Sequence, residues 1–439
     1  MVKELTLKAG TAVKAWMPEE GDAVLYAASA LFAVLTIALS GLVLYRQWAM
    51  LAVGPYLAAA VVSALIGRRR RHLEPLEHHE RRARPARRWS NPRIALFLLV
   101  LFGATLIPLS LEVAWRSEGN ATAHVQPEVS VVEQAGRRAA HGLDPYHASV
   151  KDGKPVSLVP GEPAYEAFYP YLPLMTVFGL PSSLHAPIRL TDARIVFSGV
   201  TLLVVLGALA LARAPSEHKI RTLQVLTVLP TAALLLATGG DDMPVVAFLL
   251  LAMVLAQRRR PGWSGIVLGI VSAMKFTAWP LAALALFAAR NTSGRRTPGR
   301  MALGMLVVSG PVVAPFLIHN PHVFIVNVIL FPLGLSGVAS PAASPLLGHL
   351  LVTAFPALRH VLLITAGVLG GAVLARHLIR HPPASASQAT SLAAWVMLIA
   401  ILIAPATRIG YLVYPINFFV WAAMFRAEDQ ASTLEVALA

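Results

Sequence analysis

The sequence predicts an all-α integral membrane protein with about 12 transmembrane helices, and three observations carry that prediction. The mean hydropathy is +0.64, with 56% hydrophobic and 13% charged residues, which is far more apolar than a soluble domain. Many apolar runs of roughly 17–23 residues lack internal charge, the length that crosses a bilayer as a helix. The basic residues gather in short clusters between these runs, as they do at the cytoplasmic ends of membrane spans.

The net charge of +15 therefore reflects topology and does not indicate a nucleic-acid partner. The chain has no cysteine, so neither a disulfide nor a thiolate nucleophile is available. The N-terminus lacks a short apolar core that ends in a small-residue cleavage site, so we expect no cleaved signal peptide.

The first two spans, 23–45 and 48–67, form a predicted hairpin. They lead to the arginine-rich stretch 68–89, which the positive-inside rule places in the cytoplasm. We therefore predict two parts of the chain: an N-terminal hairpin with its cytoplasmic loop over 1–90, and a second membrane module over 91–439. The next span, 94–115, runs outward and delivers the polar stretch 116–190 to the external face.

Within this external loop, "YPYLPLMTVFGLP" (169–181) is too short to span and is bounded by prolines, so we predict an interfacial or re-entrant helix. A full span there would turn three later basic clusters outward. The apolar segment 263–290 is too long for one helix and contains Lys275, so it is predicted to split into two short spans. The remaining predicted spans are 194–212, 222–238, 243–257, 301–318, 360–379, 391–405 and 409–425. Both termini are then expected in the cytoplasm.

This topology gathers the unusual polar residues toward the external side, where an ionisable group in or beside the membrane marks a site by default. The candidate site residues are Glu128, His124, Asp144, Tyr146, Tyr169, Arg194, Asp241, Asp242, Lys275, His349, Arg408 and Tyr411.

Glu128 carries the sharpest local argument. If residues 121–135 form one helix, Glu128 lies in the middle of an alanine and valine stripe with His124 about 40° away, whereas Glu133 lies about 140° away and faces solvent. Such an acid suits a proton acceptor. The alternative is a structural acid that pairs with an arginine of the loop.

The other candidates have structural alternatives that the sequence leaves open. Asp144 and Tyr146 belong to "GLDPYH", which also reads as a plain turn. Asp241 follows two glycines and is able simply to cap a helix. Lys275 either snorkels or binds an anion.

Like Lys275, Arg408 either snorkels or binds an anion. Tyr411 and Tyr414, beside Arg408, are expected mainly to pack. His349 reads first as an interface histidine. Two adjacent acids with no third ligand nearby are poor evidence for a metal, so we predict neither a metal nor a cofactor.

The order of the motifs resembles the GT-C superfamily of membrane glycosyltransferases, most closely glycosyltransferase family 87, which includes actinobacterial mannosyltransferases. The motifs that carry the resemblance are "EVSVVEQAG" (128–136), "GLDPY" (142–146), "YPYLP" (169–173), "DAR" (192–194), "GGDDMPVV" (239–246), Lys275 with Pro280, and "APATRIGYLVYP" (404–415). Glutamate stands where the family usually has its catalytic aspartate. Acids replace a Gln-x-Asn pair, and arginine with tyrosine replaces the terminal histidines.

The resemblance implies transfer of a hexose, with mannose as the first candidate, from a polyprenyl-phosphate donor to a cell-envelope glycolipid or glycan acceptor outside the cell. It implies Glu128 as catalytic base, with Lys275 and Arg408 on the leaving phosphate. The rival functions are a secondary transporter and a non-catalytic flippase or scaffold for lipid-linked sugars. A transporter would be expected to show two similar halves, and the sequence has no internal repeat.

Overall fold

The computed structural model describes residues 18–77, 91–119, 121–146, 149–151, 154–156, 163–292 and 296–438. The described chain is helical apart from one short β-hairpin, in which β1 (Ser149–Lys151) pairs antiparallel with β2 (Lys154–Val156). Among these residues eight helices are long and apolar enough to cross a membrane, or nine if α9 and α10 form one broken span. The chain is therefore a multi-pass membrane protein, and the predicted number of about 12 spans is not confirmed.

The chain divides into two compact units, which are described separately. The first comprises residues 1–124 and 227–238. Its helices are α2 (Pro18–Leu39), α3 (Val43–Glu77), α4 (Asn91–Val100), η1 (Leu101–Leu106), α5 (Ile107–Ser117), η2 (Ala121–His124) and α10 (Pro230–Thr238). The predicted division of the chain at residue 90 stays a prediction. Most of the arginine-rich stretch lies outside the described residues.

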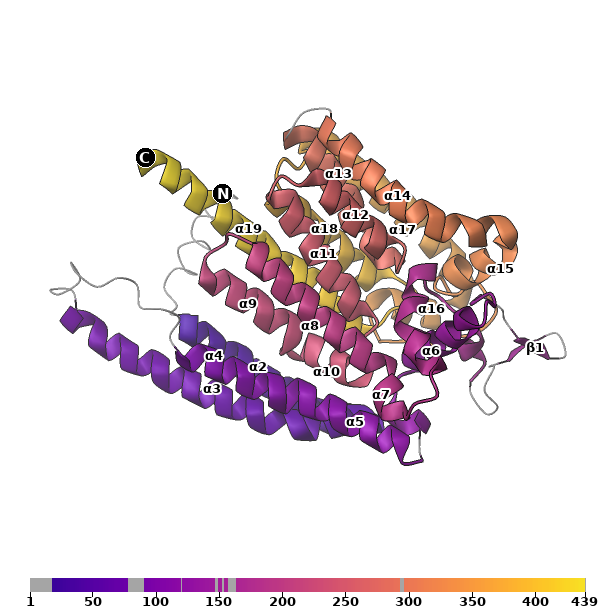
Figure 1. The fold of residues 1–439 in the computed structure, drawn as a ribbon, viewed down its shortest axis with the longest axis horizontal. Helices are drawn as coiled ribbons and strands as arrows, with labels where there is room; N and C mark the ends of the chain where they lie inside the picture. Colours follow the sequence, from indigo (N-terminus) through magenta and orange to yellow (C-terminus); the bar gives the residue numbers. More distant parts are fainter. Residues whose placement is uncertain are drawn as a thin grey trace. The chain divides into compact units, whose positions relative to one another are not determined.

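The first unit is built on the hairpin of α2 and α3, which pack along each other (Figure 1). The turn lies at residues 40–42, earlier than the sequence predicted, because Ser40 and Gly41 interrupt the helix and the Ser40 hydroxyl accepts the Leu42 N–H. The third span follows as α4, η1 and α5. Its η1 segment is a π-helix that ends just before Pro108, a residue that cannot donate to the helical ladder.

Polar contacts bind the third span to this hairpin. The Trp48 indole N–H donates to the Ala104 carbonyl at 2.8 Å, and Arg93 forms a buried ion pair with Asp22 at 2.6 Å. A Cβ on Gly103 would meet the Pro55 ring at 2.3 Å, so only glycine permits this close approach of η1 to α3.

The second unit comprises residues 125–226 and 239–439. Its polar segment contains α6 (Pro127–Ala140), the β-hairpin, η3 (Ala164–Ala167), η4 (Pro173–Ser183) and α7 (Ile188–Thr191). The remaining elements are α8 (Ala193–Leu211), α9 (Ser216–Thr227), α11 (Asp242–Gln257), α12 (Pro261–Ser272), η5 (Phe276–Ala278), α13 (Trp279–Thr292), α14 (Arg296–His319), α15 (Pro321–Ile325), η6 (Val326–Leu330), α16 (Leu347–Ala354), η7 (Pro356–Leu358), α17 (Arg359–Arg380), α18 (Ala386–Ile403), η8 (Ile409–Leu412) and α19 (Val413–Leu438).

Helix pairs form the body of this unit: α8 packs on α11, α12 on α14, and α18 on α19 (Figure 1). The predicted split of 263–290 is confirmed, since α12 ends at Ser272 and α13 begins at Trp279, with Lys275 in extended backbone between them. Residues 173–183 form only a short 3-10 helix, which agrees with the prediction that this segment is too short to span.

Helix α6 packs against η4 through two glycines. A Cβ on Gly136 would lie 2.1 Å from the Gly179 backbone, and a Cβ on Gly179 would lie 2.0 Å from the Val132 carbonyl oxygen. Both positions thus require glycine, since backbone meets backbone there. This contact fixes α6, and with it Glu128, on the second unit.

Candidate functional site

Glu128 lies in the first turn of α6, where Pro127 starts the helix. The predicted helix over 121–135 is wrong. Pro127 restricts Gln126 to extended backbone and offers no N–H, so a 3-10 turn ends at His124 and a separate α-helix begins. His124 therefore does not share a helical face with Glu128. The acid itself is buried, as predicted.

Arg408 reaches Glu128 from 280 residues further along the chain. Its Nη1 donates to both carboxylate oxygens, at 3.0 Å and 2.9 Å. Burial alone would lower the pKa of Arg408, but the charge of Glu128 outweighs it and the pKa is raised, so the guanidinium stays charged. Glu128 is thus ion-paired, and its partner comes from the segment after α18 and not from the polar stretch 116–190.

A second ionic cluster surrounds Lys275. The ammonium donates to Asp241 at 2.7 Å and to Asp242 at 2.6 Å. The Tyr414 hydroxyl donates to Asp242 at 2.5 Å and also contacts the Thr277 hydroxyl at 2.6 Å. Asp241 sits at the start of α11 but makes no side-chain cap, so the helix-cap alternative is wrong, and its carboxylate binds Lys275 instead.

Two tyrosine rings cover the same ammonium. It lies 5.2 Å from the centre of the Tyr171 ring and 5.7 Å from that of Tyr411, within the range of a cation–π contact. Tyr171 is held there by its neighbours, because the Leu172 and Leu174 N–H groups donate to the carbonyls of Met274 and Ala273, just before the lysine. The "YPYLP" motif thus fixes an aromatic wall beside Lys275.

The two clusters adjoin one another. A Cβ on Gly239 would lie 2.9 Å from Oε1 of Glu128, so the backbone that leads into Asp241 and Asp242 touches the acid of α6. The pKa of the Tyr171 phenol responds to both clusters. Burial raises this pKa most, and the charges of Asp241 and then Glu128 raise it further. The combined site holds three carboxylates and two cations, so no cation in it is in excess. Among the described residues no three His, Asp or Glu side chains are placed to hold a metal.

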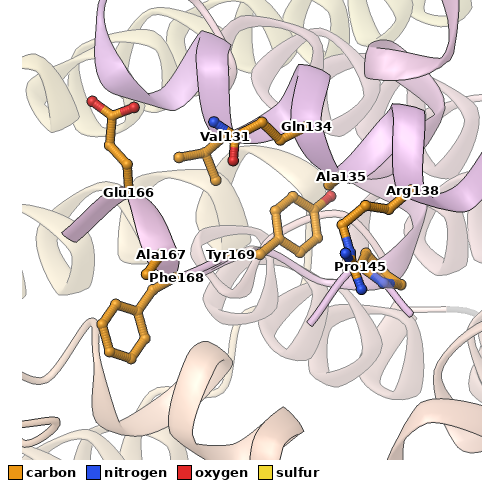
Figure 2. A pocket seen from close by; sticks show the side chains of 9 residues that line it. All are labelled: Val131, Gln134, Ala135, Arg138, Pro145, Glu166, Ala167, Phe168 and Tyr169. Carbon is orange, nitrogen blue, oxygen red and sulfur yellow. The ribbon is translucent and has the colours of Figure 1, made fainter. Parts of the chain in front are cut away.

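Tyr146 and Tyr169 form the neighbouring aromatic group. The Tyr146 hydroxyl donates to the Tyr171 carbonyl at 2.9 Å, and its ring packs 5.5 Å from the Tyr169 ring. Asp144 accepts the Tyr146 N–H and forms the turn that the sequence allowed. The Tyr169 backbone N–H donates to Oδ1 of Asn327 at 2.7 Å, and Tyr169 lines a small pocket beside α6 (Figure 2).

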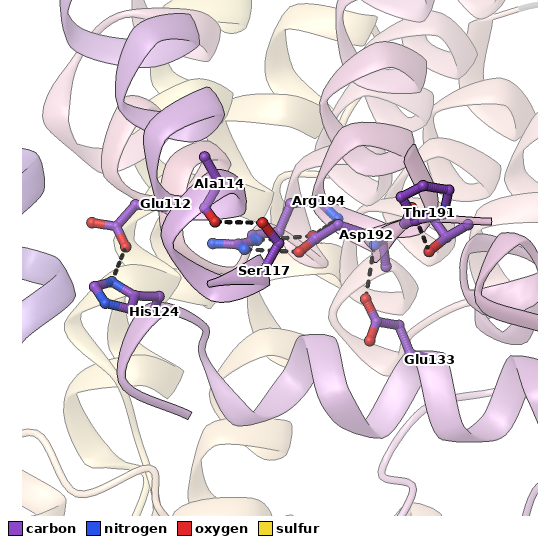
Figure 3. A network of polar contacts seen from close by, with 10 residues as sticks. Glu112, Ala114, Ser117, His124, Glu133, Thr191, Asp192 and Arg194 are labelled. Carbon is purple, nitrogen blue, oxygen red and sulfur yellow. Dashed lines mark hydrogen bonds and ion pairs between the residues drawn. The ribbon is translucent and has the colours of Figure 1, made fainter. Parts of the chain in front are cut away.

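Arg194 forms a closed local pair. Its guanidinium donates twice to Asp192, at 2.9 Å and 2.8 Å, and both side chains are 0% exposed (Figure 3). Asp192 also accepts the Arg194 N–H and caps α8. Glu133 is 4% exposed and accepts the Ala193 N–H at 3.0 Å, so the prediction that Glu133 faces solvent is wrong. The cause is α8, whose N-terminus needs acceptors.

The last two predicted residues make contacts of their own. In the first unit, His124 pairs with the buried carboxylate of Glu112 at 3.0 Å (Figure 3). In the second unit, His349 on α16 contacts the Pro405 carbonyl through Nδ1 at 3.0 Å. No described hydrogen bond joins His349 to Glu128 or Lys275, so a site role for either histidine stays a prediction.

Sequence reasoning missed Tyr171 and underrated Tyr414. Tyr171 lies inside the quoted "YPYLP" motif, two residues after Tyr169, and the motif by itself gave no reason to prefer one of its two tyrosines. Tyr414 was expected to pack, but its hydroxyl binds Asp242. Alternation in an extended segment was the available signal for Tyr171, since residues two apart face the same side.

The comparison with known families gives one match: the family model described as glycosyltransferase family 87 covers residues 168–405. No curated protein sequence matches the chain significantly. The matched range begins after Glu128 and includes the Tyr171, Asp241, Asp242 and Lys275 cluster. Because the match spans more than half of the chain and the described helices are those of a multi-pass membrane protein, the chain belongs to glycosyltransferase family 87 and is a membrane glycosyltransferase.

Proposed function

We propose that this glycosyltransferase moves a hexose, with mannose as the first candidate, from a polyprenyl-phosphate donor to a glycolipid or glycan acceptor of the cell envelope. The single observation that carries the proposal is the adjoining pair of ionic clusters around Glu128 and Lys275. It supports a site with one acid available as base and two cations for a leaving phosphate. The site would face the outside of the cell, with both termini in the cytoplasm.

The reaction would be a direct displacement at the anomeric carbon. The acceptor oxygen forms a bond to that carbon while the bond from the carbon to the phosphate oxygen breaks. Glu128 takes the proton of the acceptor hydroxyl, and the polyprenyl monophosphate leaves with its charge held by Arg408 and Lys275. Atoms and charge balance without another reactant.

The resting contacts add one condition to this scheme. Arg408 occupies both oxygens of Glu128, and Lys275 is occupied by two aspartates. An arriving phosphate has to compete with these carboxylates for the cations. When the phosphate draws Arg408 toward itself, one oxygen of Glu128 becomes available to the acceptor hydroxyl. Donor binding would thereby activate the base.

The direct test is Glu128→Gln in the purified full chain, assayed for sugar transfer from polyprenyl-phosphate mannose. Gln keeps an oxygen for Arg408 but has no basic carboxylate, so we expect turnover to fall about 10³-fold, within the range for loss of a general base. Retention of the polyprenyl-phosphate lipid by the variant, measured by binding, would separate lost chemistry from lost substrate.

Glu133→Gln is the matched control, since it lies on the same helix, is also buried and keeps an acceptor oxygen for the Ala193 N–H. It should retain wild-type turnover. Unaltered glycan products from Glu128→Gln would remove Glu128 as the base. In a deletion strain, mass spectrometry of cell-envelope glycolipids should show the loss of a mannosylated species, and an unchanged profile would contradict the proposed substrates.

A further inference from the structure

Arg408 lies in a short irregular segment between two helices. Helix α18 ends at Ile403, and η8 begins at Ile409. Between them Arg408 has extended backbone, with φ −122° and ψ 140°. A segment of this kind has no hydrogen-bond ladder of its own, so its N–H and C=O groups need partners from elsewhere in the chain. Those partners therefore decide where the Arg408 side chain is placed.

The partners come from residues 340–349, the stretch that leads into α16 and forms its first turn. The Thr407 N–H donates to the Ala342 carbonyl at 2.9 Å, and the Ser344 N–H donates to the Thr407 carbonyl at 2.9 Å. The two stretches thus form a parallel β-bridge. Next along the chain, the Ile409 N–H donates to the Ser344 hydroxyl at 3.0 Å. Hydrogen bonds therefore hold the backbone on both sides of the arginine.

The first turn of α16 holds the beginning of the same irregular segment. Nδ1 of His349 lies 3.0 Å from the Pro405 carbonyl oxygen, and because a carbonyl only accepts, Nδ1 is the donor. A Cβ on Gly348 would lie 1.8 Å from the Ile403 carbonyl oxygen, so only glycine permits this approach. Both ends of the irregular segment are thus in contact with the 340–349 stretch.

The sequence of this stretch, "SPAASPLLGH", explains its extended form. Pro341 and Pro345 flank the paired residues, and each restricts the residue before it to extended backbone. Neither proline has an N–H, so a helix cannot continue through this region. The Ser340 hydroxyl also accepts the Ala342 N–H at 3.2 Å. The local sequence therefore favours the extended conformation that the pairing with Thr407 needs.

The register of this pairing sets the direction of the arginine. Successive side chains of extended backbone point to opposite sides. Thr407 is 0% exposed, and its hydroxyl donates to the Ile401 carbonyl at 3.0 Å, whereas the Arg408 side chain is 27% exposed and reaches Glu128. A shift of one residue would exchange the two sides and take the guanidinium away from the acid. The bonds that fix the register therefore fix the contact between Arg408 and Glu128.

We propose that residues 340–349 are a clamp that positions Arg408 for the leaving phosphate, with Ser344 and His349 as its positioning residues. Both residues act through the arginine and not on the reacting atoms. The assignment rests on the proposed transferase function, in which Arg408 holds the charge of the phosphate. It gives His349 a role in the site without contact with the substrate.

The test is a double-mutant cycle between Ser344 and Arg408 in the purified full chain. Ser344→Ala removes the acceptor of the Ile409 N–H. We expect it to lower kcat for transfer from polyprenyl-phosphate mannose about 10-fold, as for a small misplacement of a catalytic group. In the Arg408→Gln background the same substitution should lower kcat less than about twofold, because the arginine through which it acts is already gone. An equal loss in both backgrounds, or wild-type kcat in Ser344→Ala, would overturn the assignment.

Conservative and matched variants complete this test. Ser344→Thr keeps the hydroxyl and should retain kcat near the wild-type value. His349→Ala should lower kcat as Ser344→Ala does, and His349→Asn, which keeps an N–H for the Pro405 carbonyl, should recover it. Ser336→Ala removes a hydroxyl of the preceding loop that accepts the Val338 N–H, and it should leave kcat unchanged. An equal loss of kcat in Ser336→Ala would indicate a general disturbance of the loop and contradict the clamp.

A binding measurement separates the clamp from the transfer reaction. The probe is undecaprenyl phosphate, which carries the phosphate but no sugar. Ser344→Ala should weaken its binding about 5-fold, and less than about twofold in the Arg408→Gln background. If the wild type transfers no sugar but shows this coupling, the donor reaction is wrong and the clamp stands. If it transfers sugar and both cycles are additive, the clamp is wrong and the transferase function stands. A wild type that neither transfers sugar nor binds this lipid would overturn both.

Discussion

Two arginine–carboxylate pairs in the second unit have the same chemistry but differ in how the chain builds them. Arg194 and Asp192 are two residues apart, and both side chains are 0% exposed. Arg408 and Glu128 are 280 residues apart, and their side chains are 27% and 6% exposed. The first pair closes the N-terminus of α8, whereas the second joins two distant segments at an accessible place.

The difference teaches that burial of a charge does not by itself identify a site. A pair with no access to solvent cannot readily exchange its partner for a ligand, so we expect Arg194 to stabilise the fold and not to bind substrate. Arg408 retains exposure and faces an acid that also touches Gly239 and adjoins the Lys275 cluster. Three substitutions test whether exposure separates the roles of these two pairs.

The largest effect is expected for Arg194→Gln, which should lower the stability of the folded protein. Removing the guanidinium leaves the fully buried Asp192 without its ion-pair partner, which costs about 3–5 kcal/mol. Thermal unfolding of the purified protein should show a clearly lower midpoint, while the KM for donor in the surviving folded fraction stays at the wild-type value. A raised donor KM with normal stability would assign Arg194 to the site instead.

Arg408→Gln should have the opposite signature. Without Arg408, one of the two cations proposed to hold the leaving phosphate is lost. We expect kcat to fall about 10²- to 10³-fold, as for removal of one charge-stabilising donor. The midpoint of thermal unfolding should fall less than in Arg194→Gln, because the Arg408 side chain is 27% exposed whereas the Arg194 side chain is fully buried. Steady-state kinetics and unfolding of both variants under the same conditions provide the comparison, and wild-type kcat in Arg408→Gln would refute the proposed role.

Gly239→Ala tests the contact between the two clusters and should have the smallest effect. The added Cβ would lie 2.9 Å from oxygens of both Gln126 and Glu128, so these flexible side chains must shift. Displacement of Glu128, the proposed base, should lower kcat by about 10-fold to 10²-fold. Gly207→Ala, where an added Cβ meets nothing within 4 Å, is the matched control. Equal kcat for the two variants would show that Gly239 does not position Glu128.

The sequence predicted more of the site than of the local helices that carry it. The candidates Glu128, Asp241, Asp242, Lys275, Arg408 and Tyr411 all lie in the two adjoining clusters. The pairing itself was not predicted. The sequence suggested an arginine of the same loop as the partner of Glu128, whereas in the structure Glu128 pairs with Arg408, from the segment after α18. A charged residue in an apolar stretch is a candidate site residue, but the stretch does not identify its ion-pair partner.

The errors have local causes. Pro127 is a helix start, and extending one helix through it to His124 ignored the restriction that proline places on the preceding residue. A helical wheel placed Glu133 on the solvent side because the wheel takes no account of the other helices that pack against α6. In the folded chain α8 begins beside it and supplies a backbone N–H.

By itself the sequence determined that the chain is a membrane protein of many helices, that 263–290 breaks at Lys275, and that its motifs are those of a glycosyltransferase family. These follow from composition, from the length of apolar runs and from local residue order, which need no knowledge of the fold. Which charges meet, and that Tyr171 covers Lys275, became visible only in the folded chain. Those relations join residues far apart in the chain, and packing alone brings them within bonding distance.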